Sequence, residues 1–103
     1  MNDKIYQKQT TIWKTIDTVY YFFYDLEEEE LIEFEDRKNS DIMVEYWVRT
    51  KEVSIYIKRT KEPIVERVEF LSANIEYFLN DDIYIPEEIR KALLEIKNYV
   101  SKE

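Results

Sequence analysis

Residues 42–59 alternate between apolar and polar side chains in two runs, 42–49 and 52–59. A period of two in β-branched and aromatic residues is typical of half-buried strands. A turn centred on Thr50 and Lys51 would place Val48 opposite Val53 and make one face of the hairpin wholly apolar. We therefore expect the rest of the chain to pack on that face.

The segment 30–36 alternates in the same way and is predicted to pair with 42–49. Placing Ile32 beside Val44 keeps the apolar residues of both strands on the core face. The sequence thus predicts a three-stranded antiparallel meander, with strands at about 30–36, 42–49 and 52–59.

Three other segments carry apolar residues at spacings of three and four, which predicts amphipathic helices. The first begins near Thr11; its aromatic run 20–24 would also suit a strand, and we favour the helix. The second covers about 62–79 and the third about 86–101, which Pro86 opens. The predicted fold is α+β, with an N-terminal helix, the meander and two C-terminal helices. The predicted apolar stripes are Ile12, Ile16, Val19, Phe23 and Leu26; Ile64, Val68, Leu71, Ile75 and Phe78; and Ile89, Leu93, Ile96 and Val100.

The chain has 103 residues, which fits a single domain over 1–103 with 1–9 as a flexible arm. Cysteine, histidine and glycine are all absent. The first absence excludes a disulfide framework, and the last excludes phosphate-binding loops and EF-hand loops, which need glycine. Positive backbone φ is expected at Asn39 and Asn80, because asparagine tolerates it best after glycine.

Without histidine or cysteine, a general base would have to be Asp, Glu, Lys or Tyr, and no serine lies in a nucleophile motif. Glu33 and Glu35 have a spacing that could bind a hard cation, but we favour the interpretation that they form the solvent face of an amphipathic strand. Glu95 and Lys97 downstream of Asp81 and Asp82 loosely resemble a nuclease pattern, yet they fall on a predicted helix. We expect no enzyme, no catalytic residue, no metal and no cofactor.

Charge is distributed unevenly, with a net charge of -8 and no Lys or Arg between Lys14 and Arg37. Such an acidic block must be solvated or meet a basic partner. The ordinary interpretation is a charged surface that keeps the protein in solution. The sharper one is a surface that imitates nucleic acid and binds the basic groove of another protein. The predicted partner-binding residues are Asp25, Glu27, Glu28, Glu29, Glu30, Glu33, Glu35, Asp36, Glu45, Trp47 and Tyr56.

Trp47 and Tyr56 are predicted on the outer face of the sheet, covered by a helix or by a second subunit, where aromatic residues act as anchors. The hypothesis is a small acidic non-enzymatic protein-binding module whose partner has a basic nucleic-acid-binding surface; a homodimer is left open. Small acidic inhibitors carried by viruses, of the anti-CRISPR kind, are similar in bulk composition, although no motif identifies one. Inhibition of a nucleic-acid-binding machine is the most specific form of this hypothesis.

The alternative is a small nucleic-acid-binding regulator that uses basic residues beside the sheet aromatics. A net charge of -8 opposes a polyanion, so we do not expect direct binding. Residues 1–11 are polar, and no apolar run approaches the roughly 20 residues of a membrane span. We expect no membrane contact and a cytoplasmic protein, for example in an infected host cell. The basic residues of the alternative are Arg49, Lys51, Lys58, Arg59 and Lys61.

Overall fold

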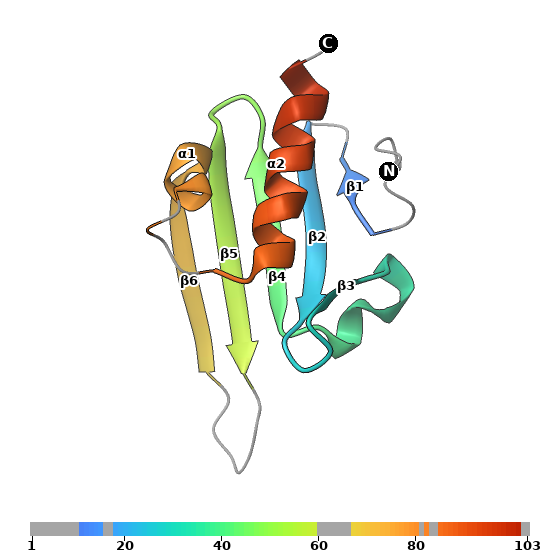
Figure 1. Ribbon diagram of the computed structural model, residues 1–103. Coiled ribbons are helices and arrows are strands. Elements are labelled where there is room, and N and C mark those ends of the chain that lie inside the picture. Colours follow the sequence, from blue (N-terminus) through green and yellow to red (C-terminus); the bar gives the residue numbers. More distant parts are fainter. Residues whose placement is uncertain (1–10, 16–17, 60–66, 81, 83–84, 102–103) are drawn as a thin grey trace.

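The computed structural model describes residues 11–15, 18–59, 67–80, 82 and 85–101, and the predicted arm 1–9 lies outside them. In this part of the chain, six strands form an antiparallel sheet in the order β1-β2-β4-β5-β6, with β3 paired to β2 (Figure 1). No helix in it is long and apolar enough to cross a membrane. The elements are β1 (Trp13–Lys14), β2 (Val19–Asp25), β3 (Glu30–Ile32), the 3-10 helix η1 (Phe34–Asn39), β4 (Ile42–Trp47), β5 (Glu52–Arg59), β6 (Arg67–Asn74), α1 (Ile75–Leu79) and α2 (Glu87–Ser101).

The long helix α2 lies across one face of the sheet (Figure 1). Its buried stripe includes Ile89, Leu93 and Ile96, which are 0–1% exposed. Each such side chain contributes roughly 1.5–3 kcal/mol when it leaves water. The sheet contributes to the same core the side chains of Tyr20, Phe22, Tyr24, Ile42, Val44, Tyr46, Val53 and Ile55.

The predicted N-terminal helix is wrong, because 19–25 form β2. Tyr20 and Phe22 face the core, whereas Phe23 lies on the other face, where its ring is 6.2 Å from that of Phe34. A strand covered on both faces has a continuous apolar run rather than an alternating one. The helix-like spacing within that run arises by chance, and the strand preference of aromatic and β-branched residues prevails.

The predicted meander is also wrong, because β2 occupies the position beside β4 that was assigned to 30–36. Of that segment, only Glu30–Ile32 is a strand, and it pairs with β2. The following residues, Phe34–Asn39, form the 3-10 helix η1. β2 is the better partner because it pairs with β4 over six residues, 19–24, and each of these six is apolar or aromatic.

Strands β4 and β5 lie where hairpin strands were predicted, but their register differs by two residues. Tyr46 is opposite Val53, and the connection is longer than the predicted turn at Thr50 and Lys51. The favoured two-residue turns, types I′ and II′, both need positive φ at the first central position, which β-branched Thr50 resists. The longer loop needs it only at Lys51, with φ 62°. Positive φ thus occurs at Thr18, Glu29 and Lys51, and not at Asn39 or Asn80 as predicted.

The predicted helix at 62–79 is wrong for most of its described length, and 62–66 lie outside the described residues. Arg67–Asn74 is the strand β6, which pairs with β5 over eight residues. Only Ile75–Leu79 is helical, and the Asn74 side chain accepts a hydrogen bond from the Glu76 N–H at its start. Without β6, the equally long β5 would be an unpaired edge strand. The last predicted helix, 86–101, corresponds to α2 within one residue.

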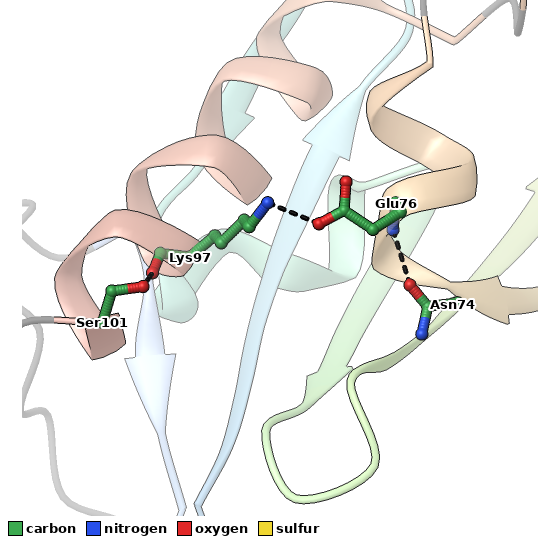
Figure 2. A network of polar contacts seen from close by, with 4 residues as sticks. All are labelled: Asn74, Glu76, Lys97 and Ser101. Atoms are coloured by element: carbon green, nitrogen blue, oxygen red, sulfur yellow. Dashed lines mark hydrogen bonds and ion pairs between the residues drawn. The ribbon is translucent and has the colours of Figure 1, made fainter.

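A polar network joins the two helices (Figure 2). The Lys97 ammonium pairs with the Glu76 carboxylate, and the Ser101 hydroxyl donates to the Lys97 carbonyl oxygen at 2.8 Å. The Glu76 side chain is 65% exposed, and an exposed ion pair of this kind contributes only about 0.2–1 kcal/mol. Apolar burial, rather than this pair, therefore holds α2 on the sheet.

The network lies near Tyr46, whose phenol titrates in an unusual environment. Burial raises its pKa above the usual 10.0, the charge of Lys97 lowers it in part, and the charge of Glu76 adds to the rise. The folded state therefore holds this proton more tightly than the unfolded chain. Tyr46 stabilises the fold below about pH 10 and loses that contribution as the pH rises through its folded-state pKa.

We predict that Tyr46→Phe flattens the alkaline loss of stability. The free energy of unfolding, from urea titrations between about pH 8 and about pH 11, should fall less steeply for this variant than for the wild type. Tyr77→Phe is the control, since Tyr77 is 52% exposed, and it should follow the wild type. Parallel curves for Tyr46→Phe and the wild type would contradict the prediction.

Candidate functional site

The acidic segment begins in the turn between β2 and β3, which two carboxylates hold in place. Asp25 Oδ1 accepts hydrogen bonds from the N–H groups of Glu27 at 2.8 Å and Glu28 at 3.3 Å. Asp41 Oδ2 accepts from the Leu26 N–H at 2.8 Å. Side-chain acceptors of this kind fix a turn by replacing backbone partners. The turn therefore presents the side chains of Glu27–Glu30, all exposed, to solvent.

The segment after the turn forms a pocket of about 490 Å³ beside η1. Of the residues described, no three acidic, histidine or cysteine side chains are grouped so that they could hold a metal ion. The carboxylates of the pocket thus share a surface without converging on one point, which suits several separate cationic groups. The pocket is lined by Thr11, Asp25, Glu30, Leu31, Ile32, Glu33, Asp36 and Asn39.

A second pocket, of about 330 Å³, extends the acidic surface to the start of α2. Glu29 lines it together with Glu87 and Glu88. These two glutamates are about sixty positions downstream in the sequence, and no local signal connects them with the acidic segment. We call the combined surface the acidic end: Asp25, Glu27, Glu28, Glu29, Glu30, Glu33, Glu35, Asp36, Glu87 and Glu88.

The charge of the acidic end is little compensated by the described part of the chain. Glu87 pairs with Arg90, whose Nη1 is 3.7 Å from its Oε1. None of the other acidic-end residues forms an ion pair with a described lysine or arginine. Arg37 is held elsewhere: its guanidinium lies 4.0 Å from the ring centroid of Phe34 and donates to the Phe34 carbonyl oxygen at 2.8 Å.

The remaining predicted site residues lie on the sheet face opposite α2. Tyr56 donates to Glu45 Oε1 at 3.5 Å, and its pKa is raised by burial first, then by the charge and hydrogen bond of Glu45. Trp47 is 45% exposed and is not covered by a helix as expected. It pairs with Val19 at one end of β2, whereas the acidic turn follows the other end. The five intervening residues of β2 separate these ends by about 20 Å, so the predicted residues form two surfaces.

An aromatic cluster covers part of the same face and was not predicted. It consists of Trp13, Tyr21, Phe23 and Phe34, with ring centroids 5.1–6.2 Å apart. Edge and tilted contacts at these distances stabilise packing. Phe34 was expected in the predicted strand 30–36, with its side chain on the core face, but it is the first residue of the 3-10 helix η1. The cluster fixes η1, and with it the acidic pocket, to the sheet.

The basic residues of the nucleic-acid alternative are also divided. Arg49 and Lys51 lie in the β4–β5 turn, whereas Lys58 and Arg59 are the last residues of β5, at the other end of the strand. Seven residues of strand separate Lys51 from Lys58 by about 23 Å, and Lys61 lies outside the described residues. The backbone positions of the four residues therefore lie at two opposite ends of the β4–β5 hairpin.

We predict that Asp25 holds the acidic turn as a hydrogen-bond acceptor rather than as a charge. Asp25→Ala leaves the N–H groups of Glu27 and Glu28 without this acceptor and should lower the free energy of unfolding by about 1 kcal/mol. Asp25→Asn keeps an acceptor oxygen at the same place and should retain most of the stability. Urea unfolding near neutral pH provides the measurement, and equal losses in both variants would contradict the acceptor role.

Comparison of the chain with protein-family models, with curated proteins and with solved structures finds no match.

Proposed function

We propose that the protein is a non-enzymatic binding module whose acidic end captures a protein partner with a basic surface. The observation that carries this proposal is the concentration of exposed, largely unpaired carboxylates around two adjoining pockets. A folded chain reduces its own stability by crowding like charges. Such crowding is compensated when the charges are used to attract and orient a partner.

The partner chemistry follows from the arrangement of the carboxylates. They are distributed over a turn, a 3-10 helix and the start of α2, as phosphates are distributed along a nucleic acid strand. A protein groove lined by Lys and Arg to bind phosphates would meet them at several points. Inhibition of such a nucleic-acid-binding protein is the most specific form of the proposal.

Trp47 extends the surface that one partner can reach. A standard interface buries about 800 Å² on each side, which easily spans the roughly 17 Å of β4. A partner that docks on the acidic end and continues along the outer face would reach Glu45, Tyr56 and Trp47. Partly exposed aromatic residues at such positions are common anchors.

We predict that neutralising the turn weakens binding of a basic probe more than the same change in net charge elsewhere. The quadruple variant Glu27–Glu30→Gln removes four negative charges and so raises the net charge by four. The double variant Glu52→Lys with Asp82→Lys raises it by the same amount, at exposed positions outside the acidic end. Affinity for a labelled arginine-rich peptide, measured by fluorescence anisotropy, should fall about tenfold further in the quadruple variant. Both variants should unfold at the same urea concentration as the wild type.

Equal losses of affinity in the two variants would show that net charge alone attracts the peptide and would overturn the acidic end as a site. The same two variants can be used in affinity capture from a cell lysate. Proteins that the wild type and the charge-matched control both retain, and that the quadruple variant loses, are the candidate partners. A gel shift with single-stranded RNA and DNA tests the alternative, since tight binding would overturn the preference for a protein partner.

A further inference from the structure

Strand β6 is a long edge strand of the sheet (Figure 1). It pairs with β5 over eight residues, and no described strand pairs with its other side. The opposite edge is different, since β1 has only two residues. Long unpaired edges are templates for another strand, and proteins usually protect them with charged residues, proline or a bulge. In β6 the charged residues Arg67 and Glu69 lie in the first half of the strand; residues 70–74 carry no charge, the strand has no proline, and its pairing with β5 is continuous.

The hydrogen bonds of β6 show which backbone groups point outward. The Ile75 N–H donates to the Lys51 carbonyl oxygen at 2.8 Å, one step beyond the pair Glu52–Asn74. In an antiparallel ladder, hydrogen-bonded and non-hydrogen-bonded pairs alternate. Ala73 and Leu71 therefore bond to β5, whereas the N–H and C=O groups of Ser72, Phe70 and Val68 point away from it. These outward groups can accept another strand.

Leu71 shows where that strand would make apolar contact. It lies opposite Ile55, which is 2% exposed in the core, yet Leu71 itself is 46% exposed. The helix α2 lies over the middle strands and not over β6, and the short helix α1 lies over the C-terminal end of β6 (Figure 1). A half-exposed leucine in the middle of an open edge loses water when a second strand is added.

We propose that β6 pairs with β6 of a second copy of this chain, antiparallel and centred on Leu71. Leu71 then faces Leu71 of the partner subunit as a non-hydrogen-bonded pair, in which side chains are closest. Ser72 exchanges both backbone hydrogen bonds with Phe70 of the partner subunit. Glu69 faces Ala73 of the partner subunit, so no like charges are opposed. The product is one continuous sheet with both α2 helices on the same face.

The charge distribution favours a second copy despite the net charge of -8. The acidic end lies beside β2, three strands away from β6. In the proposed dimer, the two β2 strands are seven strand spacings apart, or about 34 Å. This distance exceeds the Debye length of about 8–10 Å at physiological salt, so the acidic ends repel each other little. The strand at the junction carries Arg67 and Glu69, whose charges cancel.

The test uses paired charges at the proposed two-fold axis. Leu71→Lys and Leu71→Glu should each give a monomer by analytical ultracentrifugation at concentrations where the wild type is a dimer. An equal mixture of the two variants should form dimers again, because opposite charges then face each other across the axis. A wild type that stays monomeric throughout a concentration series, dimeric single variants, or a mixture that stays monomeric would each overturn the proposal.

Ser72→Pro is a second variant that keeps the fold. The Ser72 N–H points outward, so proline removes no bond to β5 but blocks strand addition. It should be monomeric with an unchanged circular dichroism spectrum. In the wild-type dimer, hydrogen exchange at the Phe70 and Ser72 amides should be slower than in the Leu71→Lys monomer. Exchange at the Phe70 amide should also be slower in the wild-type dimer than in Ser72→Pro, which has no amide proton at position 72. Fast exchange in a dimer would place the interface elsewhere and overturn the proposal.

The dimer is independent of the proposed function. The quadruple variant Glu27–Glu30→Gln should dimerise like the wild type, and the Leu71 variants should bind the arginine-rich peptide like the wild type. Loss of dimerisation in the quadruple variant would contradict the proposed β6 interface. Loss of peptide binding in that variant alone leaves the interface intact.

Discussion

The burial of α2 on the apolar face of the sheet determines the position of everything else. Five α2 and connector residues, each 9% exposed or less, contact the core that β2, β4 and β5 provide. At roughly 1.5–3 kcal/mol for each large side chain, this packing far exceeds the roughly 1 kcal/mol of an exposed ion pair. The fifteen residues of α2 cover the middle strands, and the short α1 packs over one end of β5 and β6, so the remainder of β6 extends beyond both helices.

Strands buried on one face only could be predicted from the sequence, whereas a strand buried on both faces and a strand at the edge of the sheet could not. β4 and β5 alternate because one face contacts α2 and the other is more open. β2 has Phe22 in the core and Phe23 beneath Phe34, so its alternation is lost and a helical spacing appears. β6 is defined by backbone pairing with β5, and its apolar residues continue into α1 with the spacing of a single longer helix.

The candidate site could be predicted only where it is local in sequence. Glu27–Glu30 remain neighbours because the Asp25 carboxylate closes the turn that carries them. Glu87 and Glu88 join them through the packing of α2, which no spacing in the chain reveals. Trp47 is separated from them because β2, rather than 30–36, pairs with β4. Errors in strand pairing thus become errors in the composition of a surface.

The acidic end lies beside β2, towards one edge of the sheet, and the proposed dimer interface lies at β6, the other edge. A dimer through β6 presents two acidic ends at least about 34 Å apart, because the antiparallel pairing also places them at opposite ends of the strands. A partner with two basic sites at that spacing would bind both ends, and the second contact would form at high effective concentration. A partner with one site would bind each end separately and gain nothing from the dimer. If affinity for the partner rises when the protein self-associates, the partner has two basic sites. If affinity does not change, the partner has one.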